Sequence, residues 1–596
     1  MRVCDLVSKY IYDIGVSDVF MVSGGGLMFL TDGLACNEEL NVVCCHHEQA
    51  VAMATVAYAK YNGFGCGYVT TGCGGTNAIT GILNAWQDNT PCIFISGQCK
   101  RKETLRNLEV PIRQLGVQEA DIVTIVESIT KYSVMINDKE DIIYELEKAV
   151  YLAKSGRPGP VWIDIPMDIQ SAEVEEKTLK HFIPEKEKVK LFATEEELEL
   201  VAEELKKAQR PIVIAGQGIR LSGAIDEFEK LVHDHNIPFV NSRMGLDVLP
   251  TMDELSIGRI GNKGTRAGNL AVQNADLVIA LGSRLSVSST GQEYEYFARE
   301  AKVIVVDIDE YEHKKNTVKI DKIINADIKN FLSNLVIDEK NNYNSWSQKC
   351  KEWKEKYPVC LSEYYDDKDG INMYVFVEEL SKCLKEDSVV VTDAGSAVYV
   401  PAQGIRTTNK KQRYITSGGQ AEMGFTLPAV IGTCIARHGK ESIGITGDGS
   451  LQMNIQELQT IAFNKLPAKI FVWNNDGYLS IRATQTKFFD RRYIGTDKFS
   501  GVSFPDLSKI SDAYGIKYFK IDSIKNIKTI INEVLAYDGP VVCEVMCIRD
   551  QLVIPTVSSR QLKNGRMVSS PIEDMYPFLP REEFHNNMIV KPVDSE

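Results

Sequence analysis

The sequence of 596 residues lacks the features that mark membrane proteins and nucleic-acid-binding proteins. It contains no uncharged apolar run of about 18 residues, so we expect no transmembrane helix. The N-terminus, MRVCDLVSKYIYDIGVSDVF, includes acidic residues where a signal peptide has an unbroken apolar segment. Acidic residues (81) outnumber basic ones (67), and the net charge of −14 argues against binding to nucleic acid or to an anionic membrane surface.

Paired cysteine motifs are also absent. The 14 cysteines are scattered, with no CxxC pairs at zinc-site spacing and no dense framework of the kind that staples small disulfide-bonded domains. Reduced thiols fit this pattern best, so the sequence predicts a cytoplasmic protein.

The composition is that of a soluble globular protein, with 44% hydrophobic and 25% charged residues. Apolar, β-rich runs alternate with helical segments and close on Gly, Asp or Asn, as in RPIVIAGQG, ADLVIALGS and ESIGITGDGS. Continuous apolar strands separated by helices indicate parallel sheets covered on both faces. We therefore expect an α/β protein made of three doubly wound parallel-sheet domains, with its chemistry at the carboxyl ends of strands.

Two charged stretches with few apolar residues, 173–190 and 338–357, are interpreted as domain connectors. They divide the chain into three blocks, each long enough for one doubly wound sheet. The predicted domains are 1–180, 190–340 and 358–560, followed by a C-terminal tail, 561–596, that we expect to pack as an extended arm or lid.

The stretch from 442 to 481 is the most informative. One strand ends in Gly447-Asp448-Gly449-Ser450 and the next in Asn474-Asn475-Asp476-Gly477, which places Asp448 and Asn475 at the ends of neighbouring strands, 27 positions apart. Both side chains offer the oxygen ligands that Mg²⁺ prefers, and Gly449 and Ser450 at a helix start offer donors to an anion. Either motif alone would more often be a turn. Together they predict a Mg²⁺-diphosphate site.

In this order and spacing the two motifs resemble the diphosphate-binding motif of thiamine diphosphate (ThDP) enzymes. Segments elsewhere in the chain resemble, more narrowly, the large catalytic subunit of acetolactate synthase: residues 17–34, 46–98, 116–136, 155–168 and 416–436. The resemblance covers nearly the whole chain. It implies that the three domains bind the pyrimidine of ThDP, form a central FAD-binding-like unit, and bind the diphosphate.

The resemblance also implies roles for individual residues. Glu48, in the Ala- and Val-rich stretch CCHHEQAVAMATVAYAK, matches the glutamate beside N1′ of the aminopyrimidine, a role that needs a carboxyl in a dry pocket. Gln118 and Gly25 match the donor side of the site. The other matched positions are Gly477 as a third metal ligand and, as cofactor contacts, Gly24, Asn77, Ala421, Met423, Gly447, Gly449, Ser450, Gly477 and Tyr478. Taken without the resemblance, Glu48 would be a common helix-start glutamate and Met423 a core methionine.

The middle block has glycine-rich turns and acidic strand ends of the dinucleotide-binding type. The residues are Gly216, Gly218, Gly282, Arg284, Asp307 and Asp309. Singly these signals are weak, but their order resembles the central domain of acetolactate synthase. The resemblance implies FAD in a structural rather than redox role, although many relatives keep this fold without a flavin.

Two acceptor-side marks of acetolactate synthases are missing. Ser288 stands where the family has an arginine that binds the second ketoacid, and Thr484 stands where it has a tryptophan. A planar guanidinium is hard to replace in carboxylate recognition, unless Arg482 or another arginine has moved in.

The expected activity is that of a carboligase. It decarboxylates a 2-oxoacid such as pyruvate and transfers the two-carbon unit to a second carbonyl, either pyruvate or a keto-sugar-like acceptor. A simple 2-oxoacid decarboxylase is the alternative, and a non-catalytic binding subunit is a distant third because Glu48 and Asp448 are both present. Since family sites lie between two subunits, we expect a homodimer or a homotetramer.

Overall fold

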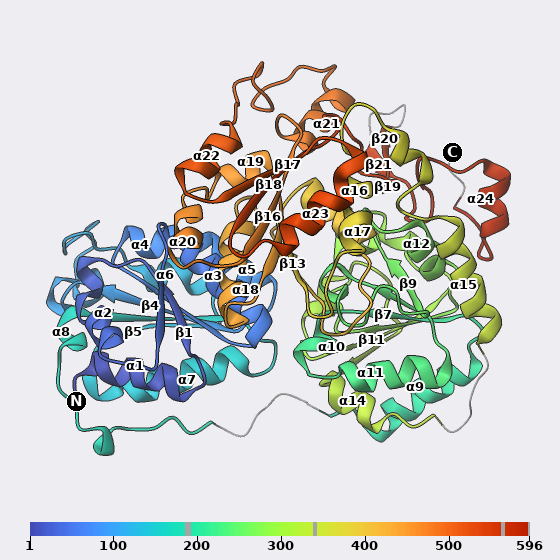
Figure 1. Ribbon diagram of the computed structural model, residues 1–596. Coiled ribbons are helices and arrows are strands. Elements are labelled where there is room, and N and C mark those ends of the chain that lie inside the picture. Colours follow the sequence, from blue (N-terminus) through green and yellow to red (C-terminus); the bar gives the residue numbers. More distant parts are fainter. Residues whose placement is uncertain (185–191, 338–342, 562–566, 594–596) are drawn as a thin grey trace.

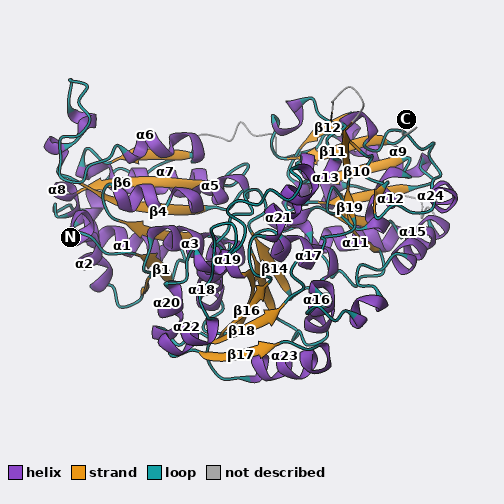
Figure 2. Ribbon diagram, turned by 90° about the horizontal axis from the view of Figure 1, so that it is seen from above, coloured by secondary structure: helices purple, strands orange, loops and turns teal. Residues whose placement is uncertain are grey.

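The computed structural model describes residues 1–184, 192–337, 343–561 and 567–593, and its three sheets each contain six parallel strands (Figure 1). Helices cover the sheets on both faces (Figure 2). The predicted fold class is therefore confirmed. Among the described residues, no helix combines the length and apolar character that crossing a bilayer requires.

The N-terminal sheet has the order β2-β1-β3-β4-β6-β5. Its strands are β1 (Asp18–Met21), β2 (Asn41–Cys44), β3 (Gly65–Val69), β4 (Cys92–Gln98), β5 (Tyr132–Met135) and β6 (Pro160–Pro166). The principal helices are α1 (Val3–Asp13), α2 (Met28–Ala35), α3 (Glu48–Asn62), α4 (Cys73–Asn77), α5 (Ile79–Gln87) and α7 (Ile142–Lys154). Strands β3, β4 and β6 are buried at every residue, as expected for a sheet covered on both faces.

The central sheet has the order β12-β11-β10-β7-β8-β9. Its strands are β7 (Pro211–Ala215), β8 (Phe239–Asn241), β9 (Ser256–Arg259), β10 (Leu277–Leu281), β11 (Lys302–Asp307) and β12 (Lys322–Asn325). Helices α9 (Glu195–Lys207), α10 (Gly218–Leu221), α11 (Ile225–His235), α12 (Arg266–Gln273), α13 (Val287–Thr290) and α14 (Ile328–Asn334) belong to the same unit.

The C-terminal sheet has the order β14-β13-β15-β16-β18-β17. Its strands are β13 (Val389–Thr392), β14 (Arg413–Thr416), β15 (Ser442–Gly447), β16 (Ala468–Asn474), β17 (Lys517–Ile521) and β18 (Val541–Met546). The helices that matter below are α16 (Met373–Ser381), α17 (Ser396–Gly404), α18 (Thr426–Ala436), α19 (Asp448–Gln452), α20 (Glu457–Phe463) and α21 (Leu479–Phe488). Two further helices are α22 (Leu507–Ala513) and α23 (Ile527–Ala536).

Residues 343–357 do not form a simple connector, contrary to the interpretation of the charged stretch 338–357. They contain helix α15 (Asn344–Lys356), whose residues Trp346, Cys350 and Trp353 are buried in the core of the central domain. The apolar residues are few but share one face of the helix, and two of them are tryptophans. Low mean hydropathy therefore concealed an amphipathic helix.

The chain after β18 returns to the central domain as an arm. It includes the short antiparallel pairs of β19 (Thr556–Val557) with β22 (Met575–Tyr576) and of β20 (Ser559–Gln561) with β21 (Met567–Ser569), and then α24 (Arg581–Asn587). Trp353 donates to Asn587 at 2.9 Å, and Arg299 pairs with Glu573 at 2.8 Å. In Figure 1 this red segment lies against the green central domain.

The N-terminal and C-terminal domains share a core built on α3 and α18. The two helices supply buried small and branched residues to one apolar cluster. A side chain on Gly432 would place its Cβ 2.2 Å from the carbonyl oxygen of Ala54, so the close approach of the helices requires glycine there. This contact positions the start of α3, and with it Glu48.

Candidate active site

The N-terminal half of the site lies at the carboxyl ends of β1, β2, β3 and β4, which are neighbours in the sheet. Glu48 follows β2 as the first residue of α3 and is buried. Its Oε2 accepts a hydrogen bond of 2.9 Å from Nδ2 of Asn77, the last residue of α4. The Ala, Val and Met residues of α3 that follow Glu48 are buried in an apolar cluster.

Gly24 and Gly25 follow β1, and the backbone of Gly24 lies against the side chain of Thr70 at the end of β3. Gln118 is exposed, adopts a positive φ of 59°, and points its carbonyl at Gly72. A Cβ on Gly72 would lie 1.9 Å from that oxygen. The structure therefore brings Gly25, Glu48, Asn77 and Gln118 to one edge of the sheet.

The C-terminal half is organised around Asp448. Its Oδ2 accepts from the backbone N–H groups of Asn475 (3.2 Å) and Gly477 (3.0 Å), and its Oδ1 accepts from Gly449 at 2.7 Å. Burial raises the pKa of this carboxyl to about 6, against the opposing effect of those backbone donors. A cation beside the carboxylate would offset that burial cost.

The donor set around Asp448 fits a small hard cation. Oδ1 of Asn475 is buried and has no hydrogen-bond partner among the residues that the structure describes, an arrangement that costs free energy unless a ligand is bound. No group of three or more His, Cys, Asp or Glu residues with metal-binding geometry occurs in the described part of the chain. A metal here would be held by one carboxylate, the Asn475 amide, a backbone carbonyl such as that of Gly477, and the oxygens of a bound diphosphate.

A second buried carboxyl, that of Asp393, lies beneath this motif and was not identified from the sequence. Its Oδ2 accepts from Oγ of Ser450 at 2.5 Å and from Oγ1 of Thr446 at 2.9 Å, and burial raises its pKa. Ser450 in turn accepts from the Gly424 N–H at 2.8 Å. The signal was available, because Asp393 ends a strand in VVVTDAGS, one strand away from β15.

The segment after β14, residues 417–424, is held by buried polar side chains of the N-terminal domain. Asp88 accepts from the N–H groups of Gly418 and Gly419, both at 2.7 Å, and pairs with Lys60 at 2.7 Å. Asn84 donates to Glu422 at 2.6 Å. Ala421 has a positive φ of 50° and Met423 is half-buried, so both predicted cofactor contacts lie on a tightly anchored loop.

The two halves also touch directly. Nδ2 of Asn454, which follows α19, donates to Oε1 of Gln49 at 3.0 Å, one residue after Glu48. The N–H of His46 donates to the Glu457 carboxylate at 3.0 Å. Gly449 lies against the ring of Tyr478, so these two predicted contacts are neighbours.

Arg482 does not offer its charge to a substrate. It is 1% exposed, and its guanidinium donates to Asp550, to the carbonyl oxygen of Asp476 at 3.0 Å and to that of Asn475 at 3.0 Å. The carbonyl of Arg549 is a further acceptor. Arg482 therefore holds the loop that carries Asn475, and it does not replace the missing acceptor-side arginine. Thr484 is exposed on the same helix.

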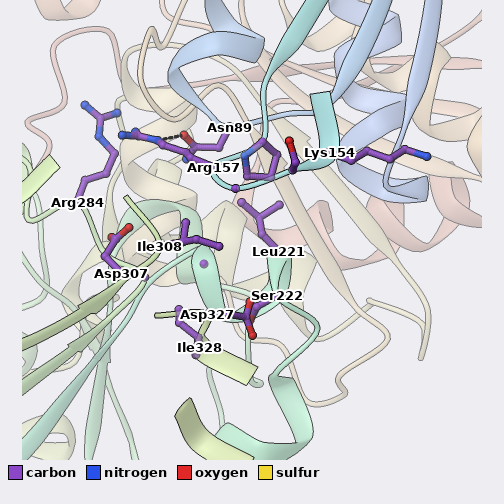
Figure 3. Close-up of a pocket in the computed structure, with 15 residues that line it drawn as sticks. Asn89, Lys154, Arg157, Leu221, Ser222, Arg284, Asp307, Ile308, Asp327 and Ile328 are labelled. Carbon is purple, nitrogen blue, oxygen red and sulfur yellow. Dashed lines mark hydrogen bonds between the residues drawn. The ribbon is translucent and has the colours of Figure 1, made fainter. Parts of the chain in front are cut away.

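A cavity of about 320 Å³ separates the central and N-terminal domains (Figure 3). Gly218, Gly282, Arg284 and Asp307 line it, as do Asn89 and Arg157 of the N-terminal domain. Gly216 does not line it but packs against Gly282, where a Cβ would lie 2.1 Å from the carbonyl oxygen. Asp309 is paired with Arg157 at 2.8 Å and helps to join the domains.

Comparison with known proteins identifies the class. Residues 1–125 match the N-terminal TPP binding domain of thiamine pyrophosphate enzymes, residues 198–335 the central domain, and residues 393–545 the C-terminal TPP binding domain. Thiamine pyrophosphate is the other name of ThDP. The chain belongs to the thiamine pyrophosphate enzyme family, with one family domain on each of the three sheets.

Within that family the chain is similar to acetolactate synthases. It is 34% identical over 560 residues to the acetolactate synthase large subunit of Lactococcus lactis, covering 93% of both chains. It is 32% identical over 565 residues to the chloroplastic acetolactate synthase 2 of Nicotiana tabacum, covering 91% of this chain and 82% of the relative. The large subunit of Porphyra purpurea is 31% identical over 572 residues. The chain is therefore a ThDP-dependent carboligase that resembles acetolactate synthase.

Proposed function

We propose that this enzyme decarboxylates pyruvate and transfers the two-carbon unit to a carbonyl that carries no carboxylate, such as that of a keto-sugar. The observation that carries the proposal is the state of the acceptor side: Ser288 stands where the resemblance to acetolactate synthases implies an arginine, and Arg482 donates to the loop of Asn475. When bound, ThDP supplies the electron sink for decarboxylation. The chain's own residues hold it, orient it and move protons.

Mg²⁺ is proposed as the ion that joins the diphosphate to the C-terminal domain. Asp448, Asn475 and the Gly477 carbonyl are the proposed ligands, and the unpartnered Oδ1 of Asn475 supports this choice. Gly447, Gly449 and Ser450, at the start of α19, would lie against the phosphate oxygens. Asp393 keeps Ser450 in position through its 2.5 Å hydrogen bond.

Glu48 is proposed as the proton-handling group. Asn77 orients its Oε2, and the apolar residues of α3 keep water away. A carboxyl held in this position can share a proton with a ring nitrogen of the bound cofactor. Ala421 and Met423 would bind the same cofactor from the C-terminal domain, and Gly25 and Gln118 would face the donor.

A homodimer, or a dimer of dimers, is proposed as the active assembly. Each half of the site borders exposed apolar residues: Val110, Ile112, Leu115 and Val117 beside Gln118, and Ile481, Phe488, Phe489 and Ile494 after Tyr478. Large apolar side chains clustered beside a site favour burial against another chain. Sedimentation analysis of the purified enzyme tests this assembly, and an active monomer would contradict it.

A competition experiment tests the acceptor. Pyruvate and a nucleotide-linked keto-sugar are offered together, and the branched sugar product is expected to exceed acetolactate. Ser288→Arg is expected to shift the product ratio toward acetolactate by about tenfold or more, because a charge-assisted hydrogen bond contributes about 1.5 to 3 kcal/mol. Efficient acetolactate synthesis by the unmodified enzyme at sub-millimolar pyruvate would refute the proposal.

Simple decarboxylation is the second candidate, favoured by the same absence of an acceptor-side arginine. A decarboxylase releases free aldehyde from pyruvate alone, whereas a carboligase waits for its acceptor. Product analysis with and without acceptor separates the two.

FAD is proposed as a structural cofactor of the central domain. The cavity of about 320 Å³ is the proposed place for its nucleotide half, because Asp307 ends β11 there and Gly282 follows β10. The absorbance spectrum of the purified protein, with mass analysis of the released ligand, tests this assignment. We also propose a cytoplasmic location, which the unpaired state of all 14 cysteines supports.

A further inference from the structure

Three cationic side chains lie between the central and C-terminal domains, and none of them has an acidic partner in the described part of the chain. Arg243 follows β8 and Arg259 ends β9, which are neighbouring parallel strands, so both lie at the carboxyl edge of the central sheet. Lys263 lies four residues beyond Arg259. The ring of Tyr399, on α17 of the C-terminal domain, faces Arg243 at 5.3 Å and Lys263 at 5.9 Å.

Arg259 is the most unusual of the three. It is 2% exposed, and its Nε and Nη1 atoms have no hydrogen-bond partner among the described residues. Burial, together with the neighbouring charge of Arg243, lowers its pKa to about 9. A buried guanidinium with unused donors destabilises the folded state. A bound anion that accepts hydrogen bonds from those donors would offset this cost.

Further cationic side chains lie close to Arg259. Nε of Arg243 also lacks a partner, and burial lowers the pKa of Lys263 to about 8, with a contribution from Lys487. The groups that favour charge on Arg259 are the phenols of Tyr399 and Tyr414, not carboxylates. The nearby carboxylate of Asp247 is already paired with Arg220 and Arg413.

The cluster adjoins both the cofactor-binding loops and the acceptor side. Nη1 of Arg243 donates to the carbonyl of Gly418 at 2.8 Å, three residues before Ala421. Lys487 is on α21, which begins directly after Tyr478. The carbonyl of Ser288 accepts from the N–H of Asn262 at 2.9 Å, so Ser288 lies beside Lys263 in space.

We propose that Arg243, Arg259 and Lys263 bind a phosphate-type anion, most naturally a diphosphate, that is attached to the acceptor substrate. The inference rests on the proposed carboligase function and adds the feature by which the acceptor is recognised. Three cations spread over two strand ends and a loop suit an extended dianion, whereas a single carboxylate is usually held by one arginine fork. The acceptor carbonyl itself would then need no arginine at position 288.

The test uses the full-length enzyme saturated with ThDP and Mg²⁺, so that the cofactor's own diphosphate site is filled. Uridine diphosphate is the probe, measured by calorimetry, with acetate as the carboxylate control. Uridine diphosphate is expected to bind, and Lys263→Met and Arg259→Met are each expected to weaken binding by about tenfold to a hundredfold. Lys319→Met, at an exposed lysine of the same domain, is the matched control and should bind like the wild type.

Thermal unfolding gives an independent readout. Without ligand, Arg259→Met is expected to unfold at a higher temperature than the wild type, because a buried unpaired charge has been removed. A structural arginine would give the opposite shift. Unchanged binding in both variants would overturn the proposal, as would acetate binding as tightly as uridine diphosphate, or full displacement of the probe by FAD. Release of CO₂ from pyruvate is measured separately, so failure of the carboligase function is distinguishable from failure of this site.

Discussion

The N-terminal and C-terminal sheets have the same strand order yet perform different tasks. Numbered from its own first strand, each reads 2-1-3-4-6-5, and the helix after the second strand, α3 or α18, packs against its counterpart. After the third strand the two sheets diverge. The N-terminal sheet continues with Gly72, which accommodates the Gln118 carbonyl, whereas the C-terminal sheet continues with Asp448, whose carboxylate gathers backbone donors.

In both sheets the topology sets where a site lies, and the residues of the loops set what the site can do. Both sheets present loops at the carboxyl ends of four adjacent strands. In the C-terminal sheet these loops carry hard oxygen ligands and a helix start, which suit a metal and phosphate. In the N-terminal sheet they carry one carboxyl in apolar surroundings, which suits proton transfer.

The largest effect is expected from removing the proposed metal ligand at the carboxyl edge of the C-terminal sheet. Asp448→Ala should weaken ThDP retention by about a hundredfold or more, because the diphosphate loses the charge-assisted link through its cation. Cofactor content after gel filtration and calorimetric titration measure this loss. Tight ThDP binding by the variant in EDTA would show that Asp448 does not hold a metal.

The next largest effect is expected from Glu48, whose proposed role in the N-terminal sheet is proton transfer and not cofactor binding. Glu48→Gln should keep ThDP affinity within a few fold while slowing exchange of the cofactor's C2 proton by about 10² to 10⁴, the usual contribution of a positioned acid or base. Proton exchange followed by NMR with hydrogen–deuterium quench is the measurement. If exchange were as fast as in the wild type, the contrast drawn between the two edges would fail.

A smaller effect is expected from Arg482, which holds the loop between the proposed metal ligand Asn475 and helix α21. Arg482→Met should weaken ThDP binding about tenfold, because the carbonyls of Asn475 and Asp476 lose charged donors. The acceptor preference should not change. Arg492→Met, at an exposed arginine on the following turn, is the control. If the product ratio changed while ThDP affinity did not, Arg482 would be assigned to binding of the acceptor substrate.

The smallest effect on activity is expected in the sixth strand of the N-terminal sheet, where the expected change is in stability. Asp164 in β6 accepts from the neutral donors Ser96 (2.5 Å) and Gln98 (3.0 Å), and burial raises its pKa from 3.8 to about 7. A raised folded-state pKa stabilises the protein below pH 4, and this stabilisation is lost as pH rises through 7. Relative to Asp164→Asn, the wild type should lose about 1.4 kcal/mol per pH unit in that window. Denaturant unfolding at several pH values checks this, and parallel pH profiles would contradict it.

Much of the fold could be predicted from the sequence because its signals are local. Buried parallel strands are continuous apolar runs, and Asp448 and Asn475 each follow such a run, so their approach at one sheet edge needed no further information. The prediction for helix α15 is wrong because its apolar positions are sparse. Asp393 ends a strand run, but several other acidic residues do so too, and only its burial and its bond to Ser450 distinguish it.

The sequence by itself determined the order of strands and helices along the chain, the residues that close each strand, and the absence of an arginine at position 288. Only the tertiary structure decided which of these residues meet. Contacts between distant segments decide three features: the lack of a described partner for Oδ1 of Asn475, the hydrogen bonds from Arg482 to backbone carbonyls, and the cluster of Arg243, Arg259 and Lys263 near Tyr399. The physical reason is that hydrogen-bond satisfaction and charge pairing depend on every neighbour in space, whereas sequence patterns report only neighbours along the chain.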